Sequence, residues 1–258
     1  MIINSFQIII SIIFGAIAGS FGAATGNRLS NDISLSGRSR CDDCGYQLRI
    51  IDLIPIISFL SLKGKCRHCN KTIKTEYLLA ELMSIGIFLL ILTKFSTIGL
   101  SMYFFTFLIT SSLIGIIVAD LQTHLIPDEL LITLIVGIVG LIFPLSKSLF
   151  ISNFMISLIT SGIFFCIWWL TEGKGMGFGD VKLVGLLAFW LGKEKIWVGL
   201  YLAFLLAAVW GIASIIKNRA TLKTRIAFGP FLIFGCLLSL QWGENLMRFF
   251  RDHLVFFR

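Results

Sequence analysis

Two aspartates lie at the edges of long apolar segments, where their side chains could act as a pair. Asp120 follows the run LITSSLIGIIVA, and Asp180 ends the glycine-rich stretch GMGFGD. An ionisable acid at membrane depth is energetically costly, so it is a candidate for function by default. Two carboxyl groups a few ångströms apart cannot both ionise comfortably, and one keeps a proton near neutral pH. One could activate a water while the other donates a proton to a scissile carbonyl, so the pair predicts hydrolytic chemistry.

The glycines that precede Asp180 suit the same chemistry. Without a Cβ atom, glycine can adopt unusual backbone angles and can let a peptide substrate come close. We predict that four residues near the two aspartates bind the substrate: Gly177, Gly179, Asp128 and Lys182.

Four of the six cysteines form two C-x2-C pairs, CDDC and CRHC, separated by 21 residues. Each pair can turn two sulfurs toward one ion, and two pairs complete a tetrahedron. A reduced cytoplasmic setting argues against disulfides. We predict a closed, structural zinc site with the ligands Cys41, Cys44, Cys66 and Cys69, and a redox dithiol or an iron–sulfur centre as the alternative. His68 is expected to be an exposed surface residue, and Cys166 and Cys236, which lie in apolar runs, to be inert packing residues.

The composition predicts a multi-pass membrane protein. Of 258 residues, 57% are hydrophobic and only 14% are charged, which is more apolar than a soluble core requires. Apolar segments of about 17–25 residues, long enough to span a bilayer, recur along most of the chain. The predicted fold class is all-α and polytopic, with about eight transmembrane helices and a cytoplasmic zinc-binding loop. The expected helices cover about 5–25, 77–92, 98–119, 128–144, 150–170, 181–192, 196–216 and 226–242.

The first expected helix has two notable features. No Lys or Arg precedes it, so it lacks the basic region of a signal peptide and is expected to be retained. Its glycines at 15, 19, 22 and 26 fall close to one face. Such a face of small residues predicts the close approach of a neighbouring helix.

The basic residues predict topology rather than a nucleic-acid partner. The formal net charge is +8, but Lys and Arg lie in short loops between apolar segments, as the positive-inside rule describes. Residues 28–76 carry nine Lys and Arg against five Asp and Glu, which predicts a cytoplasmic loop and an N-terminus outside. Counting helices from there brings Asp120 and Asp180 to the same cytoplasmic face. The loop KNRATLKTR is predicted to be cytoplasmic and the C-terminal tail to be outside.

Together these motifs resemble the type IV prepilin peptidases, the GxGD-type membrane aspartic proteases. The matching blocks follow the order of the family: GSF at 19–21, SGRSRCDDCGYQL, LIPIISFLSLKGKCRHC, EYLLAEL, DLQTHLIPDEL and GMGFGDVKL. They lie within residues 19–82 and 119–183, nearly half of the chain. The last two blocks are very specific in combination.

The resemblance implies an endopeptidase of the bacterial inner membrane that removes the short basic leader of prepilins or pseudopilins after a glycine, on the cytoplasmic side. It places the two catalytic aspartates of the family on Asp120 and Asp180. The apolar and polar stretches of the sequence predict a first transmembrane helix over 1–27, a tetracysteine zinc loop over 28–76 and a membrane core over 77–258, and the resemblance implies that this core is the peptidase. Acids that could position a basic leader are Asp128, Glu129 and Glu172.

In many members of this family the same protein N-methylates the new N-terminal residue with S-adenosylmethionine. The resemblance therefore implies a second activity and a second cofactor beside structural zinc. The stretch GAATGNRL departs from the Asn–Val pair that is usual at this point of the family. The expected partners are prepilin or pseudopilin substrates and membrane lipid, without nucleic acid.

Three other readings of the aspartates and the cysteine loop are open. Asp120 and Asp180 could be ordinary helix-terminal acids that interact with solvent or with a nearby lysine. They could relay protons in a proton-coupled transporter, because intramembrane acids often serve that purpose. The chain could also be a non-catalytic assembly factor that docks through its cysteine loop, in which case Asp120→Ala would keep full function.

Overall fold

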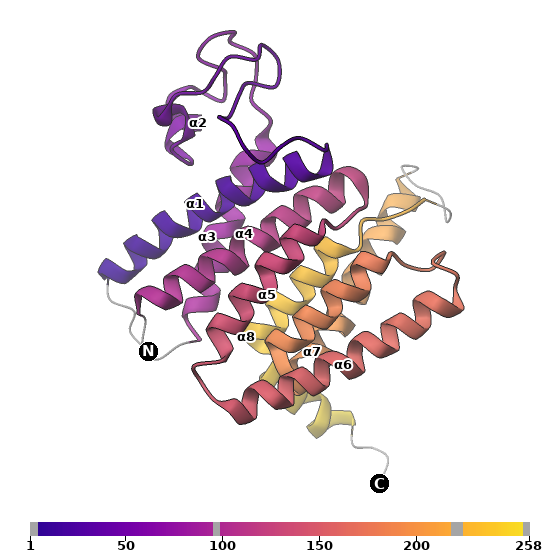
Figure 1. Cartoon of the computed structure of the whole chain (residues 1–258). Coiled ribbons are helices and arrows are strands. Elements are labelled where there is room, and N and C mark those ends of the chain that lie inside the picture. The colour runs from indigo at the N-terminus through magenta and orange to yellow at the C-terminus, as the bar shows by residue number, and fades with distance from the viewer. Residues whose placement is uncertain (1–4, 95–98, 218–223, 255–258) are drawn as a thin grey trace. The chain divides into compact units, whose positions relative to one another are not determined.

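Figure 1 shows a computed structural model of the chain, which describes residues 5–94, 99–217 and 224–254. Every regular element among these residues is a helix, and the only β-type pairings are the isolated bridges Arg40–Gln47 and Lys65–Thr72. The chain forms two compact units, residues 1–118 and residues 119–258. The division into 1–27, 28–76 and 77–258 stays a prediction.

The prediction of an all-α membrane protein is confirmed. Five of the described helices are long and apolar enough to cross a bilayer, and they are α1 (Ser5–Ser30), α3 (Thr75–Leu92), α4 (Leu100–Thr123), α6 (Lys147–Leu170) and α7 (Phe178–Ile216). The remaining elements are η1 (Ile50–Leu53), α2 (Ile57–Ser61), α5 (Asp128–Ile142) and α8 (Gly229–Leu254). The number of eight spans stays a prediction.

The first unit packs around the glycine face of α1, as predicted. A Cβ atom on Gly19 would lie 2.8 Å from the carbonyl oxygen of Ala80 in α3, and one on Gly26 would lie 2.9 Å from the Cα of Gly115 in α4. Gly15 likewise approaches α3 and Gly22 approaches α4. The absence of side chains therefore lets two helices pack closely against α1.

In the second unit, α7 packs against α5, α6 and α8 (Figure 1). The helices expected over 181–192 and 196–216 are the two parts of α7, which a non-helical Gly192, with φ 73° and ψ −176°, separates by a kink. Asn153 of α6 donates a hydrogen bond of 2.9 Å to the carbonyl of Phe189, just before the kink. This bond supplies a partner to a carbonyl that the interrupted helix cannot satisfy in full.

The two cysteines outside the C-x2-C pairs differ. Cys236 is fully buried in α8, as expected of a packing residue, whereas Cys166 is exposed on α6. The packing role expected for Cys166 is therefore wrong. Most of the basic loop 217–225 and the end of the C-terminal tail, whose sides of the membrane were predicted, lie outside the described residues.

Candidate active site and metal centre

Asp120 lies in the last turn of α4, because this helix continues to Thr123 rather than ending near residue 119. His124 follows the helix; its φ of 54° is left-handed, and its N–H donates to the carbonyl of Asp120 at 3.0 Å. The Asp120 side chain is buried, with only 4% of the residue exposed. A buried carboxyl group needs a polar partner.

That partner is Gly229, the first residue of α8. Its backbone N–H donates a hydrogen bond of 2.8 Å to Oδ2 of Asp120. First-turn N–H groups have no partner within their own helix and lie at the positive end of the helix dipole. Gly229 was absent from the predicted site, although a glycine before a proline in AFGPF marks the start of a helix.

Asp180 lies in the first turn of α7, where Gly177 is the N-cap residue. Oδ2 of Asp180 accepts a hydrogen bond of 3.3 Å from the N–H of Gly177, and the Asp180 N–H donates to the Gly177 carbonyl at 3.2 Å. This is the geometry of an acid in a capping box. The Asp180 carboxyl group also interacts electrostatically with Asp120, so the two predicted aspartates lie close together within one unit.

The glycines before Asp180 have more limited roles than predicted. Among those at 173, 175, 177 and 179, only Gly173 has a positive φ, of 71°. The expectation of unusual backbone angles at the other three is wrong. Gly179 matters for close approach, because a Cβ atom there would lie 3.0 Å from Cβ of Ile126. This contact packs the start of α7 against the segment that follows α4.

Asp128 and Lys182 bind each other in the structure. Nζ of Lys182 lies 2.6 Å from Oδ1 of Asp128 and 5.1 Å from the ring centre of Phe178. The pair therefore links the first turn of α5 to the first turns of α7. A role for Gly177, Gly179, Asp128 and Lys182 in binding a substrate stays a prediction.

The four predicted zinc ligands converge. The sulfur atoms of Cys41, Cys44, Cys66 and Cys69 all lie within 4.8 Å of one another, and those of Cys41 and Cys69 are 3.9 Å apart. A tetrahedral zinc site with Zn–S bonds of about 2.3 Å has sulfur atoms about 3.8 Å apart. The cluster therefore fits a tetrahedral metal ion held by four thiolates.

The two C-x2-C turns are built alike. The N–H of Cys41 bonds to the carbonyl of Tyr46, and the N–H of Cys66 bonds to the carbonyl of Lys71. Gly45 and Asn70 occupy equivalent places and both have a positive φ, of 67° and 57°. Such turns direct backbone N–H groups at the sulfur atoms. The N–H groups of Cys69 and His68 lower the pKa of Cys66 to about 7, which favours the thiolate that a metal requires.

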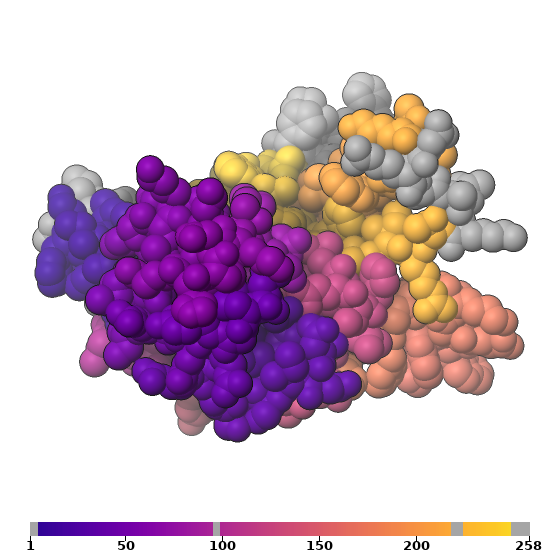
Figure 2. Space-filling view, turned by 90° about the horizontal axis from the view of Figure 1, so that it is seen from above, coloured from indigo at the N-terminus to yellow at the C-terminus, as the bar shows by residue number. Residues whose placement is uncertain are grey.

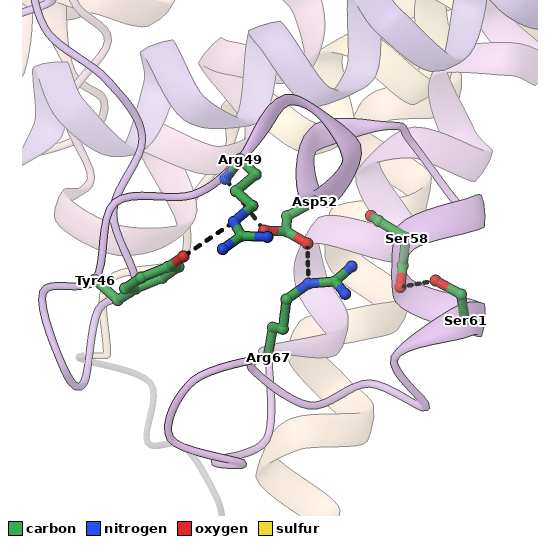
Figure 3. A network of polar contacts seen from close by, with 6 residues as sticks. All are labelled: Tyr46, Arg49, Asp52, Ser58, Ser61 and Arg67. Atoms are coloured by element: carbon green, nitrogen blue, oxygen red, sulfur yellow. Dashed lines mark hydrogen bonds and ion pairs between the residues drawn. The ribbon is translucent and has the colours of Figure 1, made fainter.

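A polar network joins the two turns (Figure 3). His68 is exposed, which confirms it as a surface residue. Its ring stacks on that of Tyr46, with the ring centres 4.8 Å apart. Nε of Arg67 donates to Oδ1 of Asp52 at 2.8 Å, and the N–H of Arg49 donates to Oδ2 at 3.1 Å. Burial raises the pKa of Asp52, but the hydrogen bonds from Arg67 and Arg49 outweigh it, so the pKa lies below its ordinary value.

Comparison with known proteins decides the family. Residues 13–95 match the bacterial peptidase A24 N-terminal domain, and residues 102–213 match the type IV leader peptidase family. A protein of Bacillus subtilis (strain 168), named prepilin leader peptidase/N-methyltransferase, is 30% identical over 254 residues, which cover 93% of this chain and 96% of the relative. This chain belongs to the type IV leader peptidase family.

Two further relatives carry the same name. The protein of Aeromonas salmonicida (strain A449) is 30% identical over 229 residues, covering 84% of this chain and 76% of the relative. The protein of Burkholderia pseudomallei (strain 1026b) is 31% identical over 212 residues, which cover 80% of this chain and 67% of the relative. No solved structure is significantly similar to this member of the leader peptidase family.

For this leader peptidase we expect about one zinc ion per chain, bound by the four clustered thiolates. Replacing Cys66 by Ser should remove the ion and expose residues 38–74 to protease, since a closed four-thiolate site contributes directly to folding. Elemental analysis and limited proteolysis measure both effects. The matched control is Cys166→Ser, which should keep the zinc. Retention of zinc in Cys66→Ser, or protease resistance without it, would contradict a structural zinc site.

Asp52→Asn should weaken zinc binding by about 3- to 10-fold, because it removes a hydrogen-bonded ion pair whose arginine is partly exposed. The pKa of Asp52 in the folded protein lies below its ordinary value of about 3.9. The ionised Asp52 carboxylate therefore stabilises the fold in full above that ordinary pKa, and this contribution is lost only as the pH falls through the lowered value. The weakening should thus be the same at pH 6, 7 and 8. Chelator competition measures it, with Asp32→Asn as control. A ratio that varies over this range would be inconsistent with the assignment.

Proposed function

We propose that this chain is a membrane aspartic endopeptidase that removes the short basic leader of type IV prepilins or pseudopilins, cutting after a glycine at the cytoplasmic face of the bacterial inner membrane. The observation that carries the proposal is the electrostatic interaction between the Asp120 and Asp180 carboxyl groups. Asp120 accepts a hydrogen bond from the backbone N–H at the start of α8, and Asp180 accepts one from the N-cap residue of its own helix, α7. Both aspartates lie within the segment that matches the leader peptidase family.

The two aspartates would divide the proton work. Both aspartates accept a backbone N–H at the start of a helix, but the bond to Asp120 is the shorter, 2.8 Å against 3.3 Å, so the negative charge of Asp120 is the better stabilised of the two. Asp120 is then the base that takes a proton from water. Asp180 is the acid that donates its proton to the scissile carbonyl. As the tetrahedral intermediate collapses, the C–N bond breaks, the leaving amine takes up the proton held by Asp120, and the proton on the former carbonyl oxygen returns to Asp180.

Two cofactors accompany this proposal. Zinc would be held by Cys41, Cys44, Cys66 and Cys69, where it would stabilise the loop and leave no open coordination position for chemistry. S-adenosylmethionine would be the donor for N-methylation of the new N-terminus. The methylation proposal is supported by the names of the relatives, all of which combine leader peptidase with N-methyltransferase.

Glu129 is the acid that we propose to recognise the basic leader. Of the three acids considered, Asp128 is paired with Lys182 and Glu172 with Lys174. Glu129 is exposed in the first turn of α5 and forms no ion pair among the described residues. Its charge is therefore available to a Lys or Arg of the substrate.

Glu129→Lys should raise KM for a prepilin with a basic leader by about 3- to 10-fold and leave kcat nearly unchanged, since an exposed charge contact is worth about 1 kcal/mol. Steady-state cleavage at low ionic strength measures both constants. The control is Glu194→Lys, at an exposed position midway along α7. An unchanged KM, or an equal rise with a neutral leader, would remove Glu129 from leader binding.

The proposed function is tested by incubating the purified protein in detergent with a prepilin and reading the N-terminus of the product by mass spectrometry. We expect one cut, directly after the leader glycine, and an added methyl mass when S-adenosylmethionine is present. The control substrate carries a bulky residue in place of that glycine and should remain intact. Absence of cleavage by zinc-loaded protein, or cleavage at unrelated sites, would overturn the peptidase assignment. A transporter would instead carry protons across vesicles without cleaving any peptide.

A further inference from the structure

The loop between α1 and α3 carries an unexpected apolar surface. Its members project from η1, α2 and the residues between them, outside every candidate membrane span. Ile50, Ile51, Ile57 and Leu60 are between 64% and 76% exposed, which is unusual for large apolar side chains in water. We call the whole set the isoleucine surface, and it consists of Ile50, Ile51, Leu53, Ile54, Ile57 and Leu60.

The loop itself projects away from the helices of its unit (Figure 1), and in Figure 2 it is not covered by other described residues of that unit. Nothing in the described part of the first unit therefore covers the isoleucine surface. Exposed apolar patches of this kind mark contact with a protein or with a membrane.

A hydrogen bond determines the depth of this segment. The N–H of Ile56 donates to Oε2 of Glu81 at 2.7 Å, and Ile56 has a φ of 62°, a costly conformation for a β-branched residue. Glu81 is six residues after the start of α3, which is about 9 Å along the helix axis. Because α3 has only 18 residues, about 27 Å, it is slightly shorter than a hydrocarbon core of about 30 Å, so Glu81 lies within the membrane rather than outside it. Its hydrogen bond holds Ile56 at or below the membrane interface.

Charge next to the isoleucine surface favours an anionic ligand. A surface cavity of about 420 Å³ is lined by Arg38, Gln47, Leu48, Arg49, Ile50 and Ile51. Two guanidinium groups beside two isoleucines match a phosphate group beside an acyl chain. The acid of this segment, Asp52, is already paired with Arg67. A basic peptide would be repelled from the same place.

We propose that the isoleucine surface inserts into the lipid leaflet at the end of the membrane where α1 ends and α3 begins, and that the cavity between Arg38 and Arg49 binds the phosphate headgroup of an anionic phospholipid there. The Ile56–Glu81 hydrogen bond holds the segment at the required depth. The cysteine loop is then a peripheral membrane element as well as a metal site. This inference goes beyond the proposed function and stands without it, since it invokes neither substrate nor catalysis.

The test places a photoreactive benzoylphenylalanine at Ile57 of the full chain, in nanodiscs of phosphatidylcholine and phosphatidylglycerol without substrate. Irradiation should give a lipid adduct at least 10-fold more abundant than the same label at Asn70, an exposed polar position of the same loop. Ile51 serves as a second label site if the first variant fails to bind zinc. An adduct with another copy of the chain, or lipid adducts no more abundant than at Asn70, would overturn insertion.

The headgroup part is tested on the same adducts. Phosphatidylglycerol should be enriched over its bulk share by at least 3-fold at Ile51, which lines the cavity. Arg38→Gln should return the share to the bulk value, whereas Lys147→Gln, at an exposed position in the second unit, should not change it. Adducts that follow the bulk composition in the unmodified chain would overturn the phosphate site.

Discussion

Asp120→Asn and Asp180→Asn should each lower the rate of prepilin cleavage by about 10²- to 10⁴-fold, the contribution that general acid–base catalysis ordinarily makes. An amide has nearly the shape of a carboxyl group but can neither take a proton from water nor release one to a carbonyl. Because both aspartates are predicted to act in the same step, we expect kcat to fall while KM changes little. Cleavage of a purified prepilin, followed by mass spectrometry, measures the loss.

Two comparisons make this prediction specific. The double variant should be no slower than the slower single variant, since residues that act as a unit are not additive. Glu194→Gln, which neutralises an exposed acid farther along α7, should cleave at the normal rate. Normal cleavage by either aspartate variant would show that the pair is not the catalytic dyad, and would reopen the assembly-factor and transporter interpretations.

Gly229→Ala should reduce cleavage by about 10²-fold without unfolding the protein. A Cβ atom at this position would lie 2.8 Å from Oδ2 and 3.4 Å from Cγ of Asp120, so the carboxyl group must move and lose its hydrogen bond. Displacement of a catalytic group by about 1 Å is enough for a loss of this size. The same cleavage assay measures it, with thermal unfolding as the check on stability.

The matched control for Gly229→Ala is Gly162→Ala in α6, where a Cβ atom would meet nothing within 4 Å. This variant should keep full activity. Adding Gly229→Ala to Asp120→Asn should cause almost no further loss, because the glycine is predicted to act only through that carboxyl group. Full activity in Gly229→Ala, or a further 10²-fold loss in the double variant, would separate Gly229 from the role of Asp120.

Local patterns in the sequence predicted the membrane class, the four cysteines that cluster in the structure and the two candidate catalytic aspartates. An apolar run of about 20 residues identifies a membrane helix, because the backbone N–H and C=O groups of a segment in lipid must form hydrogen bonds within that segment. The C-x2-C spacing predicts a turn that can hold a metal ion, because the hydrogen bonds that form such a turn lie between residues close in sequence, as from Cys41 to Tyr46. Asp120 and Asp180 stood out individually, since an acid at the edge of an apolar run is costly wherever the rest of the chain goes.

Only the tertiary structure decided which groups meet. Gly229 and Asp120 are 109 residues apart, and their contact is made by a backbone N–H that every residue except proline possesses. The pairing of Lys182 with Asp128, 54 residues apart, and of the Ile56 N–H with Glu81 likewise depends on how the helices pack. A short motif specifies the groups it carries and the local turn that holds them. The partner supplied by a distant helix follows from packing over the whole unit, which no local pattern encodes.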